Sequence, residues 1–244
     1  MSASPRGRIV LVTGTDTGVG KTWIACGLVR ALRAGGHTVA VRKPAETGCA
    51  PAPSAAARGI AAGDRRPGAA VLYPADAAAL REAADSDEPL EKICAVRLAE
   101  PLAPSVAARR AGIEIDVAGL VRSYRERARE VDVLVVEGAG GLLVPLHGRT
   151  SYADLAGDLG AGLIVVVGAR LGAINHALLT LEAARVRGLR VLGVVVNHFG
   201  PDRDLATETL GETLRSIAGV PILAEVPHRG DAGSLLPIAS LVAG

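Results

Sequence analysis

Hydrophobic residues along this chain form short continuous runs rich in Val, Ile and Leu, and these runs alternate with stretches of helical spacing. Such runs are typical of strands covered on both faces, and their alternation with helices is typical of βαβ units. The pattern predicts strands at Arg8–Thr13, Thr38–Arg42, Val131–Val136, Gly162–Val167, Arg190–Val196 and Pro221–Val226. It predicts helices at Lys21–Ala34, Ala75–Ala84, Asp116–Glu130, Ala173–Arg187 and Arg203–Ile217, with a shorter one after Asp231. The expected fold class is α/β, with a mostly parallel sheet flanked by helices on both faces.

One stretch departs from this alternation. Residues Cys49–Ala70 are rich in Ala, Pro, Gly and Arg and show no sustained period, so we expect a long loop or insertion around 49–70. The length of 244 residues suits one substantial domain. We therefore expect residues 1–244 to form a single α/β domain.

The composition argues against several classes of protein. The formal net charge is only +2, and the chain has one Trp, three Tyr and one Phe, too few for a stacking platform for nucleic acid. We find no apolar run long enough for a membrane span and no apolar signal core at the start. We expect a cytoplasmic protein that binds neither nucleic acid nor membranes. Three widely spaced cysteines do not suggest a disulfide framework or a thiolate metal site.

The clearest chemical signal lies between the first predicted strand and the first predicted helix. The sequence there reads Gly14-Thr15-Asp16-Thr17-Gly18-Val19-Gly20-Lys21-Thr22. Glycines let backbone N–H groups approach phosphate oxygens, Lys21 can reach the outer phosphates, and Thr22 can ligate Mg²⁺. Five residues separate Gly14 from Gly20, one more than in the general pattern. The motif predicts a phosphate loop that binds a nucleotide.

Two other strand ends carry candidate chemistry. Glu137 ends an apolar strand and precedes Gly-Ala-Gly-Gly, which suits a carboxylate beside Mg²⁺, although a strand-end acid facing water has the same pattern. Lys43 follows the second predicted strand and is one of three lysines among 27 basic residues. A lysine in such an arginine-rich chain favours a site for a compact cation. We predict that Lys43 contacts a phosphate or another anion and that Thr47 is a nearby hydroxyl donor, the alternative being a solvated surface lysine.

Together these residues resemble the dethiobiotin synthetase family of the phosphate-loop NTPase superfamily. The likeness extends over nearly the whole chain. Besides the segments above, it includes Pro74-Ala75-Asp76-Ala77, Ala99-Glu100-Pro101-Leu102-Ala103-Pro104, Leu171-Gly172-Ala173-Ile174-Asn175-His176-Ala177, Asn197 and Glu225-Val226-Pro227. The resemblance implies an ATP-dependent ligase of biotin biosynthesis. Its substrates would be 7,8-diaminononanoate, CO₂ and ATP, and the ring would close through a carbamate and a carbamic–phosphoric anhydride.

The same resemblance assigns roles to individual residues. Catalytic residues would be Lys21, Lys43 and Thr17. Nucleotide contacts would come from Gly14, Thr15, Asp16, Thr17, Gly18, Val19, Gly20, Lys21, Thr22, Asn197, Glu225 and Pro227. The substrate would be held by Thr17, Lys43, Thr47, Gly172, Ala173, Ile174 and Asn175. Mg²⁺ would be bound by Thr22, Asp76 and Glu137, with Asp64 as the rival of Asp76, and a homodimer would place the substrate carboxylate at the subunit interface.

A second class of function has a similar phosphate loop. Nucleotide-dependent switches and partition ATPases of the same superfamily act by changing partners rather than by joining metabolites. Those proteins usually carry a lysine five residues before the Gly-Lys-Thr lysine, and Asp16 occupies that position here. The sequence therefore favours the ligase over the switch.

Overall fold

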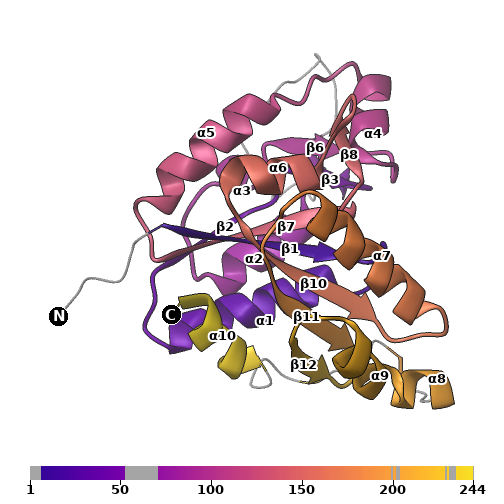
Figure 1. Cartoon of the computed structure of the whole chain (residues 1–244). Coiled ribbons are helices and arrows are strands. Elements are labelled where there is room, and N and C mark those ends of the chain that lie inside the picture. The colour runs from indigo at the N-terminus through magenta and orange to yellow at the C-terminus, as the bar shows by residue number, and fades with distance from the viewer. Residues whose placement is uncertain are drawn as a thin grey trace.

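A parallel sheet of six strands forms the centre of the molecule (Figure 1). The computed structural model describes residues 7–52, 71–198, 200–201, 204–228, 230 and 235–243. Across the sheet the strands are β12 (Ile222–Val226), β11 (Val191–Asn197), β10 (Gly162–Gly168), β1 (Arg8–Gly14), β7 (Val133–Gly141) and β2 (Val39–Arg42). All five neighbouring pairs are parallel. The α/β fold class and the six predicted strands are confirmed.

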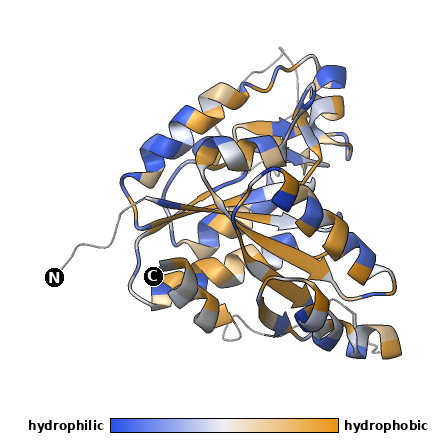
Figure 2. Ribbon diagram, viewed as in Figure 1, coloured by the Kyte–Doolittle hydropathy of each residue, from blue (hydrophilic) through white to orange (hydrophobic). Residues whose placement is uncertain are grey.

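Helices cover both faces of this sheet. On one face the core contains residues of α1 (Lys21–Ala34), α2 (Ala75–Ala83) and α10 (Leu236–Ala243). On the other face lie α5 (Val117–Ala128), α6 (Tyr152–Leu159), α7 (Ala173–Val186) and α9 (Leu210–Ile217). Alternate strand residues point to opposite faces, so Val10 and Val12 join the first core and Leu11 joins the second. The apolar strands in Figure 2 are therefore buried on both sides.

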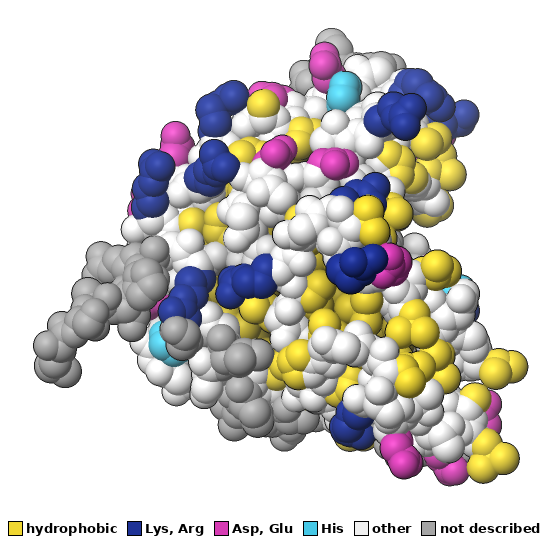
Figure 3. All heavy atoms as spheres, viewed as in Figure 1, with side chains coloured by type: hydrophobic (Ala, Val, Ile, Leu, Met, Phe, Trp, Pro, Cys, Tyr) yellow, Lys and Arg dark blue, Asp and Glu magenta, His cyan; other side chains and the backbone are white. Residues whose placement is uncertain are grey.

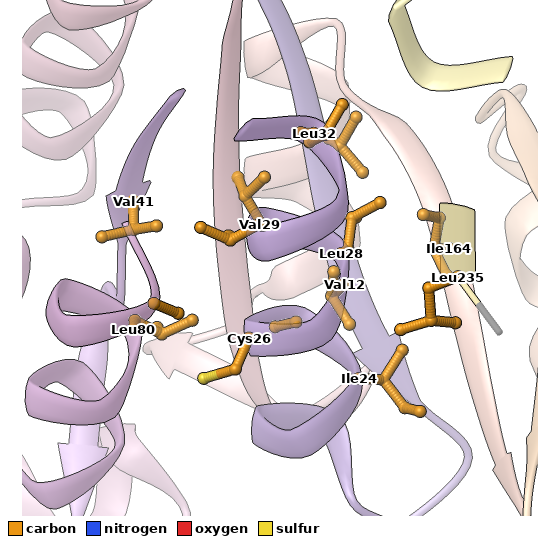
Figure 4. Packing of buried hydrophobic residues seen from close by; sticks show 14 of the residues in the cluster. Val12, Ile24, Cys26, Leu28, Val29, Leu32, Val41, Leu80, Ile164 and Leu235 are labelled. Carbon is orange, nitrogen blue, oxygen red and sulfur yellow. The ribbon is translucent and has the colours of Figure 1, made fainter. Parts of the chain in front are cut away.

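Packing around α1 fixes the helix that follows the phosphate loop. Figure 4 shows Ile24, Cys26, Leu28, Val29 and Leu32 of this helix among Val12, Val41, Leu80, Ile164 and Leu235. Burial of each large aliphatic side chain contributes about 1.5–3 kcal/mol. This packing anchors the helix whose first turn carries Lys21 and Thr22.

Several short elements were not predicted. They are β3 (Ala45–Thr47), β4 (Ala50–Pro51), β5 (Leu72–Tyr73), α3 (Leu90–Ile93), β6 (Val96–Leu98), α4 (Pro104–Ala111), β8 (Pro145–His147), β9 (Thr150–Ser151) and α6. Two of the helices have readable start signals. Pro104 stands in the first turn of α4, and Ser151 and Asp154 form a capping box at α6.

The helix predicted at Arg203–Ile217 is interrupted. It consists of α8 (Leu205–Glu208) and α9, which meet at Thr209. The hydroxyl of Thr209 donates to the carbonyl oxygen of Leu205 at 2.7 Å, a contact that often bends helices. None of the described helices is long and apolar enough to cross a bilayer.

Most of the loop predicted around 49–70 lies outside the described residues, and so does Asp64. Its described ends come together, because β4 pairs antiparallel with β5. Residues 50–51 are thereby held against residues 72–73, immediately before α2.

Candidate functional site

A cavity of about 680 Å³ opens at the carboxyl ends of β1, β2 and β7. These three strands are neighbours in the order β1-β7-β2, so side chains at their ends lie close together. The cavity is lined by Thr17, Gly18, Gly20, Lys21, Thr22, Lys43, Glu46, Thr47, Asp76, Pro101, Leu102, Ala103, Pro104, Glu137, Ala139, Gly140 and Val144. All three predicted catalytic residues and all three predicted metal ligands therefore face one space.

The phosphate loop is closed by a glycine in a conformation that other residues rarely adopt. Gly20 has φ 89° and forms the N-cap of α1. A Cβ atom at this position would lie 2.2 Å from Nδ2 of Asn197, which itself donates to the carbonyl oxygen of Val19 at 2.9 Å. The loop and the end of β11 can pack this closely because Gly20 has no side chain.

Lys21 lies at the first position of α1 and is 7% exposed. Its Nζ donates to the backbone oxygen of Asp16 at 3.0 Å, across the phosphate loop. Burial lowers the pKa of Lys21, although the nearby carboxylate of Glu137 acts in the opposite direction. An ammonium group held at the loop by one carbonyl is placed to exchange that partner for a phosphate oxygen.

Lys43 joins two carboxylates. Its Nζ lies 2.6 Å from Oε1 of Glu137 and 2.7 Å from Oδ2 of Asp76. Lys43 and Glu137 are buried, whereas the side chain of Asp76 is 41% exposed toward solvent. Burial disfavours the charge on Lys43, but Glu137 and Asp76 outweigh it and raise the pKa of Lys43. A solvated surface lysine is therefore excluded, and this lysine keeps its positive charge inside the site.

Oxygen atoms around Glu137 suit a hard cation. The hydroxyl of Thr22 donates to Oε1 of Glu137 at 2.8 Å, while the buried Oε2 of Glu137 has no hydrogen-bond partner in the described part of the chain. With Asp76 nearby, the donor set is one hydroxyl and two carboxylates, which Mg²⁺ prefers. No group of three or more His, Cys, Asp and Glu side chains converges among the described residues. A magnesium site completed by phosphate and water does not require such a cage.

Glu46 is a functional candidate that the sequence interpretation missed. Its Oε1 accepts the N–H of Asp76 at 2.9 Å and its Oε2 accepts the N–H of Ala77 at 3.0 Å. Burial raises the pKa of Glu46 to about 7, against the lowering effect of these two bonds. The two partners lie about thirty residues downstream, so no local motif marks the contact.

Residues with predicted substrate contacts divide into two groups. Thr17, Lys43 and Thr47 line the cavity together with an apolar wall from residues 101–104, which the sequence interpretation had not placed there. Of the described residues that line the cavity, none comes from Gly172–Asn175. That segment begins α7, where no side chain caps the helix and no acidic residue occurs in the first turn.

An exposed ion pair joins these two regions. Arg170, just before α7, lies 2.5 Å from Oδ2 of Asp16 in the phosphate loop. The N–H of Thr17 lowers the pKa of Asp16, and the charge of Arg170 lowers it further.

The predicted nucleotide contacts at the ends of β11 and β12 differ in orientation. The amide of Asn197 faces the phosphate loop through Val19. Glu225 directs its carboxylate to Arg215 of α9 at 2.6 Å and lies 3.5 Å from Nε2 of the buried His198. Pro227 follows β12, and its carbonyl oxygen accepts the N–H of Gly230 at 2.8 Å.

Comparison with known proteins identifies the family. A family model described as an AAA domain matches residues 8–234. A protein of Anaeromyxobacter dehalogenans (strain 2CP-1) named ATP-dependent dethiobiotin synthetase BioD is 47% identical over 197 residues, which cover 81% of this chain and 79% of that protein. Proteins of the same name from Aromatoleum aromaticum and Pseudomonas paraeruginosa are 39% and 41% identical, with 96% and 94% of both chains covered. The chain belongs to the dethiobiotin synthetase family.

Dethiobiotin synthetases are ATP-dependent ligases, so the predicted enzyme class is confirmed. Solved structures support the fold. The cell division ATPase MinD of Pyrococcus furiosus superposes with a TM-score of 0.55 at 18% identity, covering 97% of this chain and 98% of that one. The MinC:MinD cell division protein complex of Aquifex aeolicus superposes with a TM-score of 0.56 at 14% identity, covering 96% of this chain and 94% of that one. At such low identity these likenesses concern the fold alone, so they do not favour a nucleotide-dependent switch over the ligase.

Proposed function

We propose that this dethiobiotin synthetase family member converts 7,8-diaminononanoate, CO₂ and ATP into dethiobiotin, ADP and phosphate, with Mg²⁺ bound by Thr22, Asp76 and Glu137. The observation that carries the proposal is Lys43, a buried cation between two carboxylates and in the same cavity as Lys21. This arrangement suits a reaction that must bring two anions, a carbamate and a phosphate chain, into contact.

The proposed reaction has three steps. One amine of the substrate adds to CO₂ and releases a proton, which gives a carbamate. A carbamate oxygen then bonds to the γ-phosphorus of ATP while the bond to the β–γ bridging oxygen breaks, which gives the mixed anhydride and ADP. Finally the second amine attacks the carbonyl carbon and loses a proton, the bond from that carbon to the phosphate oxygen breaks, the ring closes and phosphate leaves.

The residues of the cavity have distinct tasks in these steps. Lys21 and the loop amides hold the transferring phosphoryl group, and Lys43 holds the carbamate against it. Thr17 and Thr47 donate hydrogen bonds to the carbamate or the amines. When bound, Mg²⁺ supplies positive charge at the β- and γ-phosphate oxygens. The apolar wall of residues 101–104 is suited to cover the aliphatic part of the substrate.

The adenine base is proposed to lie beside Asn197, whose amide can both donate and accept. In the structure this amide holds Val19, so the base would approach its oxygen. Glu225 and Pro227 would border the base through the backbone of their strand end, because the carboxylate of Glu225 is engaged by Arg215.

The substrate carboxylate is proposed to bind at the start of α7 of a neighbouring subunit in a homodimer. Free N–H groups and the helix dipole make an uncapped helix start attractive to an anion. The adjacent surface is apolar, with Leu171 at 84% and Leu179 at 60% exposed. Figure 3 shows hydrophobic side chains standing out along the edge where α7 and α8 lie. Such a surface suits contact with a second copy across a two-fold axis.

One assay tests the proposed reaction. ADP release is measured with ATP, Mg²⁺ and bicarbonate, in the presence and absence of 7,8-diaminononanoate. We expect release to depend on the diamine and dethiobiotin to accumulate in equal amount. ADP release independent of the diamine would indicate the switch class instead.

A further inference from the structure

The start of α2 carries a helix cap from a distant part of the chain. Pro74 occupies the N-cap position and no side-chain hydrogen bond is made there, although the first N–H groups of a helix need acceptors. The two carboxylate oxygens of Glu46 in β3 are the acceptors for the N–H groups of Asp76 and Ala77. Glu46 is buried, so water does not readily replace these bonds.

Asp76 is consequently held from two sides. Its backbone N–H donates to Oε1 of Glu46 at 2.9 Å, and its carboxylate oxygen Oδ2 lies 2.7 Å from Nζ of Lys43. The backbone anchor determines where the side chain begins, and the half-exposed carboxylate faces the cavity opposite Glu137. Without the cap, the first turn of α2 could shift, and the distance between the two carboxylates would no longer be fixed.

From these contacts we infer that Glu46 is a positioning residue, whose cap on α2 fixes the Asp76 carboxylate for divalent cation binding together with Glu137. Both oxygens of Glu46 accept backbone N–H groups, so it acts through Asp76 rather than as a ligand. The inference rests on the proposed function in one respect, the role of Asp76 as a metal ligand. Mutation of a residue that hydrogen-bonds to a metal ligand typically weakens metal affinity by roughly tenfold to a hundredfold.

Mn²⁺ is the probe, and its dissociation constant is measured by electron paramagnetic resonance with a non-hydrolysable ATP analogue bound. Glu46→Gln keeps the shape and one acceptor oxygen but places an amide donor against a backbone N–H. We expect Mn²⁺ to bind roughly tenfold more weakly. Nucleotide affinity without metal, followed by fluorescence of Trp23, should stay unchanged; Trp23 is the sole tryptophan of the sequence and adjoins Thr22.

A matched control separates positioning from general loss of a cap. Asp154 completes the capping box of α6 with Ser151, and none of the residues that line the cavity belongs to α6 in the described chain. Asp154→Asn should lower the melting temperature by about as much as Glu46→Gln does, while leaving Mn²⁺ affinity unchanged. Equal loss of Mn²⁺ affinity in both variants would overturn the inference, and so would unfolding of Glu46→Gln, since Glu46 would then hold the fold and not one carboxylate.

A double-mutant cycle gives the decisive test. If Glu46 acts through Asp76, then Glu46→Gln should change Mn²⁺ affinity by less than about twofold once Asp76→Asn is present. Additive losses would refute the inference. If Asp76→Asn alone leaves Mn²⁺ affinity intact, the proposed metal site fails. If the unaltered protein shows no diamine-dependent ADP release while the double-mutant cycle gives the expected Mn²⁺ affinities, only the proposed reaction is refuted.

Discussion

The cavity at the ends of β1, β2 and β7 and the start of α7 are both suited to anions, but they are built differently. In the cavity, Lys21 and Lys43 are buried. Lys21 donates to the backbone oxygen of Asp16, and Lys43 contacts the carboxylates of Asp76 and Glu137. At α7 the attraction comes from an uncapped helix start, with exposed Leu171 and Leu179 nearby. The first region has its charges balanced within one chain. The second exposes apolar surface, so it is the one expected to need a second subunit.

The largest effect is expected from Lys21→Ala, which removes the proposed phosphate contact from the buried region. Loss of a charge contact made in the transition state costs a few kcal/mol, so kcat should fall roughly a hundredfold or more. Steady-state ADP release with the diamine measures this effect, and circular dichroism verifies the fold. Unaltered diamine-dependent turnover would sink the assignment of Lys21.

Lys43→Arg tests whether the buried region requires a compact cation. The planar fork is larger and should not fit between Asp76 and Glu137, so its charge would lie away from the position that the lysine ammonium occupies. We expect kcat to fall roughly tenfold, which corresponds to a loss of about 1.4 kcal/mol of transition-state stabilisation. The matched control is Lys92→Arg on the exposed surface, which should behave as the unaltered protein. Near-normal kinetics of Lys43→Arg would mean that this lysine acts only from a distance.

Asn175→Asp probes the α7 region and keeps the size of an exposed side chain. A negative charge in the first turn favours the helix itself but repels a bound carboxylate. The diamine KM should rise about fivefold, for a repulsion near 1 kcal/mol, while the ATP KM stays constant.

Mixing Asn175→Asp with Lys21→Ala shows which subunit supplies the carboxylate site. If the site is shared across a dimer, a mixed dimer contains one cavity with both halves intact, and diamine KM for the recovered activity should be normal. Activity only with the raised KM, after subunit exchange is verified by mass spectrometry, would place the carboxylate site within one chain.

Arg170→Gln cuts the ion pair that joins the two regions. Exposed pairs are worth about 1 kcal/mol or less, so the ATP KM should rise by less than about fivefold. The difference should shrink as NaCl is raised, because salt screens exposed charges. Arg33→Gln, which breaks the exposed pair with Asp85 away from the cavity, serves as the control and should leave both KM values unchanged. If the ATP KM of Arg170→Gln is raised by the same factor at every NaCl concentration, Arg170 has a structural role instead.

The sequence by itself determined the strand and helix order and the chemistry of the phosphate loop. Both depend on neighbouring residues: apolar runs long enough to be buried, and a contiguous stretch from Gly14 to Thr22 whose glycines shape one turn. Lys43 and Glu137 were also predictable, since each follows an apolar run of the sequence and carboxyl ends of parallel strands share one edge.

Only the tertiary structure decided how these groups meet. The order β1-β7-β2 brings Lys43 to Glu137, 94 residues apart, and β3 brings Glu46 to the start of α2. The start of α7 follows β10, which lies on the other side of β1 from β7 and β2, and it contributes no residue to the described cavity lining. Strand order and helix placement depend on which apolar faces pack together, and this packing is a property of the whole core that no local pattern contains.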